Sequence, residues 1–271
     1  MRIRRILLTG DDGYNSIGTR LLVHFLKNRY ELKIAATKVQ QSGVGGKMSL
    51  RGNIKWEEIH VEGVDGVCVH GTPTDAIEFA EGFFKEKFDL VISGINLGAN
   101  IGASLVASGT FAAAFRALNA KLTSQALVMS WNVPIKYYLM DHHMGHDIVQ
   151  HLDYPGKVAL WLIEKIIANN FWGSELLNIN FPKKKTKNIA FTKAYKDLRA
   201  FYKYPVDIDY KNKIFDYPNE IVNTKVPVEY DIGAIKRGYI SISPLDPWML
   251  NQKILAKMLS RSSKASRKIT R

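Results

Sequence analysis

Two adjacent carboxylates, Asp11 and Asp12, directly follow a short apolar run near the start of the chain. Neighbouring carboxylates repel each other, and the repulsion is relieved when a positive charge lies between or beside them. A hard divalent cation, which binds carboxylate, carbonyl and hydroxyl oxygens, supplies that charge. The alternative is an exposed acidic turn in which each aspartate only caps the next helix. The flanking glycines, Gly10 and Gly13, favour the metal site.

Further polar segments occupy similar positions along the chain. Residues 40–46 and 93–98 are polar, contain glycine and follow apolar runs. Ser108, Gly109 and Thr110 open an alanine-rich pattern that predicts a helix over residues 108–120. Open parallel sheets bind ligands outside the carboxyl ends of their strands, and the free N–H groups at a helix start favour an anion such as phosphate. The sequence therefore predicts a metal and phosphate site at one edge of a sheet.

Other chemistry is less well supported. His142 and His146 are four residues apart and would hold a zinc ion if that segment were helical. The general-base glutamate of the usual zinc protease motif is missing between them. A solvated loop around His142, His143 and His146 is therefore the simpler interpretation, and a zinc hydrolase is kept as a rival. The single cysteine, Cys68, excludes an intramolecular disulfide and a cysteine-rich zinc site, and predicts a cytoplasmic location.

The residues of the predicted site need a scaffold that brings several strand ends together. Apolar runs typical of buried strands cover residues 4–9, 32–36, 67–69, 90–92 and 126–129. Helical patterns separate these runs, one beginning at Ser16 and one at Thr72, where Thr72, Pro73 and Asp75 are typical of a helix N-terminus. The alternation predicts a three-layer α/β/α fold with a mostly parallel, Rossmann-like sheet covered on both faces.

The pattern changes after Trp131. Residues 154–168 are predicted to be helical, 176–181 form an apolar strand, and 239–243 alternate in a way that predicts a strand with one face in water. A final helix is predicted over 246–259. We therefore expect three parts. Residues 1–135 form the core that carries the metal site, residues 136–260 a C-terminal extension of strands and a helix, and residues 261–271 a basic tail.

Composition and charge limit the possible functions. The chain has 271 residues and is 46% hydrophobic, which excludes wholesale disorder. No apolar run reaches the roughly 18 residues of a membrane span. Residues 1–150 carry 16 Lys/Arg and 14 Asp/Glu, whereas residues 151–271 carry 22 and 11. This basic half makes nucleic-acid binding an alternative function. Nucleic acid is the less favoured partner, because the tail lacks aromatic residues to stack on bases and the motifs lie in the nearly neutral half.

A series of longer motifs, in order from about residue 5 to 246, resembles the SurE family of "survival protein" nucleotidases. The N-terminal motifs are Leu7-Leu8-Thr9-Gly10-Asp11-Asp12-Gly13, Gln41-Ser42-Gly43 and Gly71-Thr72-Pro73-Thr74-Asp75. The central motifs are Ser93-Gly94-Ile95-Asn96-Leu97-Gly98-Ala99-Asn100-Ile101-Gly102 and Ser108-Gly109-Thr110. The last two are Asn178-Ile179-Asn180-Phe181-Pro182 and Gly238-Tyr239-Ile240-Ser241-Ile242-Ser243-Pro244-Leu245.

The resemblance implies a metal-dependent phosphomonoesterase, a 5′-nucleotidase, that releases phosphate from nucleoside 5′- and 3′-monophosphates. By motif position, it implies one divalent ion per subunit, Mg²⁺ or Mn²⁺, held by Asp11, Asp12, Ser42 and Asn96. Either Asp11 or Asp12 would be the general base, and the phosphate would be held by Asn100, Ser108, Gly109 and Thr110. The resemblance also implies a homodimer or homotetramer that exchanges C-terminal segments.

The chain departs from the family pattern at two positions. Gly10 stands where the family usually has Asn, and Thr37 stands where it commonly has Pro. Neither change removes an implied metal ligand. The change at position 10 removes a side-chain amide that could orient a carboxylate or contact phosphate, and the two changes leave rate and substrate preference open.

Overall fold

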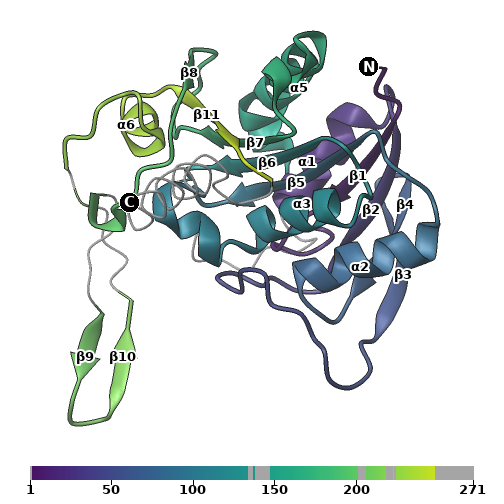
Figure 1. Ribbon diagram of the computed structural model, residues 1–271, viewed down its shortest axis with the longest axis horizontal. Coiled ribbons are helices and arrows are strands. Elements are labelled where there is room, and N and C mark those ends of the chain that lie inside the picture. Colours follow the sequence, from purple (N-terminus) through teal and green to yellow (C-terminus); the bar gives the residue numbers. More distant parts are fainter. Residues whose placement is uncertain are drawn as a thin grey trace, which may run out of the picture.

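The computed structural model describes residues 2–133, 137, 147–200, 206–217, 222 and 224–247. Within these residues, nine strands form one sheet (Figure 1). Their order across the sheet is β3 (Trp56–Val61), β4 (Val64–Val69), β2 (Glu31–Thr37), β1 (Arg5–Thr9), β5 (Leu90–Leu97), β6 (Ala126–Trp131), β7 (Leu176–Phe181), β11 (Ile240–Leu245) and β8 (Ile189–Phe191). The strands from β4 across to β7 are parallel, and the antiparallel pairs are β3 with β4 and β11 with β7. The predicted mostly parallel sheet is confirmed.

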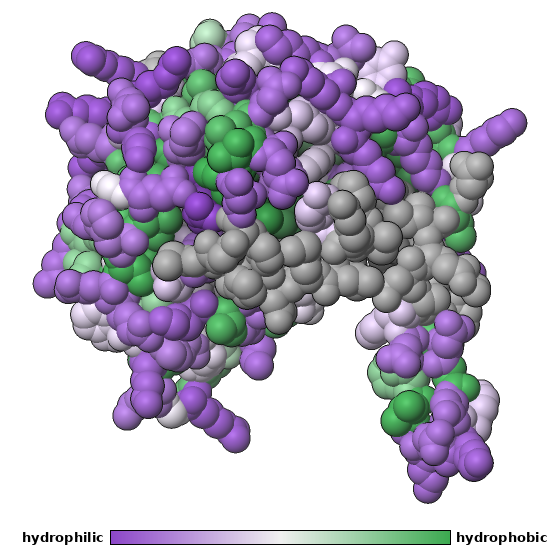
Figure 2. All heavy atoms as spheres, turned by 180° about the vertical axis from the view of Figure 1, so that it is seen from behind, coloured by the Kyte–Doolittle hydropathy of each residue, from purple (hydrophilic) through white to green (hydrophobic). Residues whose placement is uncertain are grey.

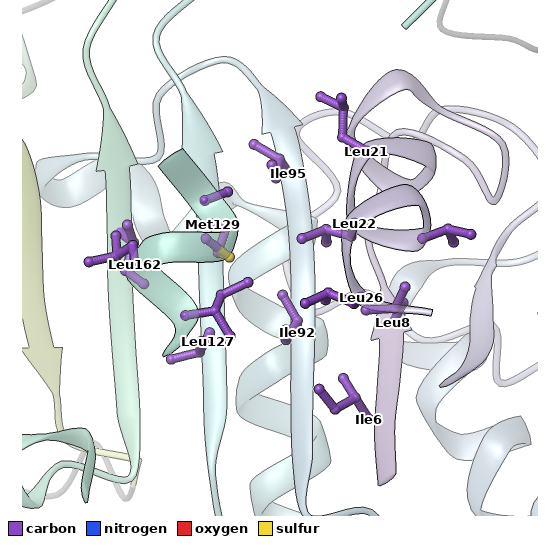
Figure 3. Packing of buried hydrophobic residues seen from close by; sticks show 14 of the residues in the cluster. Ile6, Leu8, Leu21, Leu22, Leu26, Ile92, Ile95, Leu127, Met129 and Leu162 are labelled. Atoms are coloured by element: carbon purple, nitrogen blue, oxygen red, sulfur yellow. The ribbon is translucent and has the colours of Figure 1, made fainter. Parts of the chain in front are cut away.

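Helices cover both faces of the sheet, which gives the expected three layers (Figure 1). The helices α1 (Ile17–Leu26) and α5 (Val158–Ala168) pack on one face, and α2 (Pro73–Phe84) and α3 (Gly109–Asn119) pack on the other. Figure 3 shows the hydrophobic core between the sheet and the helices α1 and α5. Strand side chains such as Ile92 and Met129 pack there with Leu22 of α1 and Leu162 of α5. Strands buried on both faces must be apolar on both, so their sequences are nearly continuous apolar runs.

The strand order reverses between β1 and β5. From β1 the chain proceeds outward to β2, then to the edge strand β3 and back to β4, and it returns through α2 to β5 on the other side of β1. In open α/β sheets, ligands bind outside the carboxyl ends of the strands at such a reversal. The fold therefore places Asp11 and Asp12, which follow β1, at the position where a ligand is expected.

The helix starts follow from local sequence. In α2, the Asp75 backbone N–H donates to Thr72 Oγ1 (3.2 Å), while the Thr72 N–H donates to Asp75 Oδ2 (2.8 Å), which is a capping box. This confirms the predicted N-terminus. In α3, Ser108 Oγ accepts from the Phe111 N–H (3.0 Å). The first turn of α3 is therefore held by its own sequence.

Two predicted strands differ from the structure. The strand predicted over 90–92 continues to Leu97, because a register shift between Ser93 and Asn96 keeps the polar segment paired with β6. The prediction that 239–243 has one face in water is wrong. The strand β11 lies between β7 and β8, and its Ser241 and Ser243 are buried and hydrogen-bonded to Thr192. The polar alternation therefore reflects a buried polar layer.

Gly18 allows α1 to approach the sheet closely. A Cβ atom on Gly18 would lie 1.8 Å from the carbonyl oxygen of Ile95 in the irregular part of β5. Only a residue without a side chain fits there. The start of α1 is thereby held against the same part of β5 that leads into the predicted site.

The C-terminal part adds the short helix α6 (Asp231–Lys236) and an arm of two antiparallel strands, β9 (Asp207–Asp209) and β10 (Ile214–Asp216). The arm projects from the body (Figures 1 and 2). The predicted boundary near residue 135, nearly all of the predicted helix over 246–259 and the tail 261–271 lie outside the described residues. Cys68 is buried. Within the described ranges, no helix has the length and apolar character to cross a membrane.

Candidate active site

Asp11 and Asp12 lie at the carboxyl end of β1, and each is only 5% exposed. The Thr110 hydroxyl of α3 donates to Asp11 Oδ1 (2.6 Å), and the Leu97 N–H of β5 donates to Asp12 Oδ2 (2.9 Å). The two carboxylates are therefore fixed by different elements on the same edge of the sheet. The exposed acidic turn, which was the alternative prediction, does not fit this burial.

Burial of the pair has an electrostatic consequence. Loss of water, followed by the negative charge of Asp12, raises the pKa of Asp11 to about 7. Hydrogen bonds from the side chain and backbone of Thr110 act in the opposite direction. No cationic side chain of the described chain is among the groups that shift this pKa. A bound cation would stabilise the ionised form that the protein alone disfavours.

Asn100 extends the network on the other side of Thr110. Its Nδ2 donates to Thr110 Oγ1 (3.3 Å) and to Ser130 Oγ of β6 (2.9 Å). Asn100, Thr110 and Ser130 are all buried. Since the Thr110 hydroxyl donates its proton to Asp11, its oxygen accepts from Asn100. Both hydrogen bonds, from Asn100 to Thr110 and from Thr110 to Asp11, therefore donate toward the carboxylate.

The first turn of α3 lies directly against Asp11. A Cβ atom on Gly109 would be 2.9 Å from both Cβ and Oδ2 of Asp11, and 3.0 Å from Cγ of Pro73. Glycine is therefore required by the close approach between α3 and β1. The structure brings Asp11, Gly109 and Thr110 into contact, and it places Ser108 at the N-cap of the same turn.

Ser42 and Asn96 lie on two segments that flank the carboxylates. The segment 40–46 is tied to the site because the Gln41 N–H donates to the Asp11 carbonyl oxygen (2.7 Å). Ser42 itself is exposed, and its Oγ accepts from Gln40 Nε2 (3.0 Å). Asn96 is half-buried near the end of β5, and its Nδ2 donates to the Gly98 carbonyl oxygen (2.7 Å). The carbonyl can only accept, so this bond identifies Nδ2 as the donor and leaves Oδ1 as an acceptor for another partner.

Comparison with known proteins identifies the family of this chain. The sequence model of the family described as "Survival protein SurE" matches residues 6–201 of the chain. The chain belongs to the SurE family. The "5'-nucleotidase SurE" of Methanopyrus kandleri is 32% identical over 251 residues, which cover 89% of this chain and 90% of that protein. The "5'/3'-nucleotidase SurE" of Wigglesworthia glossinidia brevipalpis is 31% identical over 259 residues, covering 92% and 93%.

A solved structure supports the fold of this SurE-family chain. The crystal structure of the SurE protein from Aquifex aeolicus superposes with a TM-score of 0.73 and covers 95% of this chain and 99% of that one. The two sequences are 24% identical, so the likeness bears on the fold. The family resemblance read from the motifs and the predicted α/β fold are both confirmed.

The other predicted groups have different outcomes. His142, His143 and His146 lie outside the described residues, so the zinc rival stays a prediction. In the part of the chain that the structure describes, three or more His, Cys, Asp or Glu side chains do not gather in a potential metal site. An ion at the Asp11–Asp12 pair would therefore need neutral oxygen ligands as well.

Some basic side chains of the C-terminal half have partners within the chain. Lys185 pairs with Asp153, and Lys187 lies over the ring of Trp161. Lys236 Nζ donates to three backbone carbonyl oxygens. These contacts account for part of the positive charge, and nucleic-acid binding stays an untested alternative.

Sequence reasoning did not assign roles to Ser130, Asn178 and Asn180, which belong to the same network. Asn178 and Asn180 are fully buried in β7 and bond to the backbone of Asn100. A signal was present in the sequence, because two asparagines alternate within the apolar run 176–181. Buried polar side chains at alternate positions of a strand indicate a hydrogen-bonded network on one face.

Proposed function

We propose that this protein is a metal-dependent phosphomonoesterase that releases phosphate from nucleoside 5′- and 3′-monophosphates. The observation that carries the proposal is the hydrogen bond from Thr110 to Asp11, which joins a buried carboxylate pair to the first turn of α3. A cation bound by the carboxylates and a phosphate held at that turn would be immediate neighbours. Membership of the SurE family, and relatives named as nucleotidases, support the same activity.

The residues present fit a divalent cation. Two buried carboxylates stand side by side, and burial together with their mutual repulsion raises the pKa of Asp11. The proposed ligands are Asp11, Asp12, the Ser42 hydroxyl and the Asn96 amide oxygen, which form an all-oxygen set. Such sets suit Mg²⁺ or Mn²⁺ better than the softer metals. One ion per subunit corresponds to the one carboxylate pair, Asp11 and Asp12, in this proposed ligand set.

The proposed chemistry divides among the chain's own groups. The Ser108 hydroxyl and the backbone N–H groups at the start of α3 bind the phosphate, and Asn100 holds Thr110 in place beside them. One of the two aspartates accepts the proton of the attacking water. A divalent ion, when bound, neutralises phosphate oxygens and lowers the pKa of water.

Phosphate release from nucleoside 5′- and 3′-monophosphates, measured with Mg²⁺, with Mn²⁺ and with a chelator, tests the proposal. We expect turnover that requires a divalent ion, and loss of both turnover and calorimetric ion binding in Asp11→Asn and Asp12→Asn. The control is Asp89→Asn, because Asp89 accepts from the backbone N–H groups of Arg4 and Arg5 where β1 begins, at the opposite end of the strand. Activity within a few-fold of wild type in both site variants would refute the metal assignment.

We also propose that the chain forms a homodimer or homotetramer through its C-terminal part. The arm formed by β9 and β10 exposes apolar side chains, with Tyr210 82% exposed and Ile208 and Phe215 more than half exposed (Figure 2). An isolated two-stranded hairpin is marginally stable in water, so an arm of this kind gains stability when a second copy covers it.

Light scattering after size-exclusion chromatography tests the assembly. Ile208 and Phe215 are directly paired across the arm, and the double variant Ile208→Asp/Phe215→Asp should reduce the molar mass to that of the monomer. Lys211→Ser in the exposed turn serves as the control and should keep the wild-type mass. A double variant with unchanged mass would show that the arm does not hold the assembly together.

A further inference from the structure

The backbone of Asn100 obtains its hydrogen bonds from side chains of a strand far away in the sequence. Asn180 Oδ1 accepts from the Asn100 N–H (2.9 Å), and Asn180 Nδ2 donates to the Asn100 carbonyl oxygen (2.9 Å). Asn178 Nδ2 donates to the same carbonyl oxygen (2.9 Å). Because a backbone N–H can only donate and a carbonyl can only accept, both amide orientations are determined.

The segment after β5 needs hydrogen-bond partners for its buried backbone groups. Residues 98–101 are neither helix nor strand, and they are bounded by Gly98 and Gly102, which both have positive φ angles. Asn100 is buried there, and buried backbone groups need partners. The two asparagines on β7 provide them, at positions where an apolar side chain would otherwise suit a strand buried on both faces.

The side chain of Asn100 continues the connection toward the carboxylates. Asn100 Nδ2 donates to Thr110, and the Thr110 hydroxyl donates to Asp11 Oδ1. A displacement of the Asn100 backbone would therefore change the hydrogen bonding of Thr110 and the direction of the Asp11 carboxylate. Asn180 makes two of the three bonds to the Asn100 backbone, and both of its polar atoms are used there.

We infer that Asn180, assisted by Asn178, is a positioning residue that fixes the backbone of Asn100 and, through Asn100 and Thr110, orients Asp11 for the reaction. This inference rests on the proposed phosphomonoesterase function. Asn180 bonds to Asn100 and not to the start of α3, so we expect its effect on the rate and not on the affinity for substrate. Because Asp11 is also a proposed ion ligand, the rate is measured at saturating Mg²⁺ or Mn²⁺.

The first test compares Asn180→Leu with wild type. Leucine has a similar volume but neither donor nor acceptor, so the Asn100 N–H loses its partner. Hydrogen exchange should show faster exchange at the Asn100 amide, a readout that needs no activity. Steady-state kinetics should show kcat lowered by roughly 10-fold or more with KM within about threefold, the signature of a group that acts only in the transition state.

The matched control is Thr192→Val. Thr192 is buried, and its hydroxyl hydrogen-bonds to Ser241 and Ser243 of β11. Its replacement removes buried hydrogen bonds from the same polar layer without touching Asn100. The control should lower the melting temperature while kcat stays within twofold of wild type.

A second variant keeps the inference testable if leucine prevents folding. In Asn180→Asp, a protonated carboxyl group can still accept from the Asn100 N–H and donate to its carbonyl, whereas the ionised form places a negative oxygen against that carbonyl. A buried carboxyl has a raised pKa, so protonation is accessible in the assay range. The ratio of variant to wild-type kcat should therefore rise by roughly 10-fold as the pH falls from 8 to 5.5, with folding checked at each pH.

The outcomes separate the two proposals. If wild type releases no phosphate from any nucleoside monophosphate, the proposed function fails, and hydrogen exchange at Asn100 still tests the contact with Asn180. If wild type is active, a folded Asn180→Leu protein with kcat within twofold of wild type overturns the inference. A kcat ratio for Asn180→Asp that is flat across the pH range also overturns it.

Discussion

The hydrogen bond between Thr110 and Asp11 is the contact on which the proposed activity depends most directly. Thr110→Val removes the hydroxyl and keeps a β-branched side chain of nearly the same shape. Thr110 is fully buried, and its bond to Asp11 is 2.6 Å long. A hydrogen bond to a charged group contributes roughly 1.5–3 kcal/mol, so kcat/KM should fall by about 10- to 150-fold.

The chain offers a closely matched control in Thr74→Val. Thr74 is also buried and is also the second residue of a helix on the same face of the sheet, after Pro73 in α2. Its hydroxyl has no hydrogen-bond partner in the described structure. Valine at this position should leave kcat/KM unchanged and should not lower the stability.

The assay is steady-state phosphate release from a nucleoside 5′-monophosphate at saturating Mg²⁺ or Mn²⁺, with thermal melting to confirm folding. Two results would contradict the reasoning. One is a folded Thr110→Val protein whose kcat/KM is within twofold of wild type. The other is an equal loss in Thr74→Val, which would show that buried hydroxyls at helix starts matter irrespective of Asp11.

Three further changes test other parts of the site. In metal-free protein, the native state binds a proton at Asp11 that the unfolded chain releases between about pH 4 and 7, so the free energy of unfolding should fall by up to about 4 kcal/mol as pH rises through this window. Asp11→Asn should remove this dependence of the free energy of unfolding on pH. Urea unfolding of both proteins at about pH 5 and pH 8, with a chelator present, measures it. An equal change between the two pH values in wild type and variant would contradict the reasoning. Gly109→Ala would place a methyl group 2.9 Å from Asp11, which should lower stability by roughly 1–3 kcal/mol and reduce turnover; melting and kinetics equal to wild type would mean that α3 can shift. Gly10→Asn should raise kcat/KM, because it restores the side-chain amide that the family usually has at this position. Asparagine fits there, since Gly10 does not have a positive φ angle and an added Cβ would lie 3.5 Å from Gly94 N, an ordinary contact. A folded variant with unchanged or lower efficiency would mean that the missing amide is no handicap.

Local patterns in the sequence predicted much of the scaffold. The helix that begins after Thr72 depends on a capping box within four residues, and the helix after Ser108 depends on one hydrogen bond within the same turn. Apolar runs such as 176–181 predict buried strands because both of their faces must be covered. These features involve neighbours in the chain, so no knowledge of the fold was needed.

The polar strands show where local patterns fail. Alternation over 239–243 predicted a face in water, because a polar side chain next to solvent and one bonded inside a polar layer have the same sequence pattern. The predicted strand over 90–92 was expected to end before the polar segment 93–98, and it continues to Leu97 because β6 lies beside it. Both outcomes depend on what a distant part of the chain provides.

The sequence by itself predicted which residues could bind a cation and a phosphate, because carboxylates, glycines and a helix start are recognisable from residue type and spacing. Only the tertiary structure decided which of them lie together. Strand order puts β1 beside β5 and places β6 between β5 and β7, and packing of the sheet brings Asp11 to Thr110 of α3, and Asn100 to Asn180 of β7. These pairs are 80 or more residues apart, and such contacts arise only from packing of the whole sheet, since no local interaction can specify them.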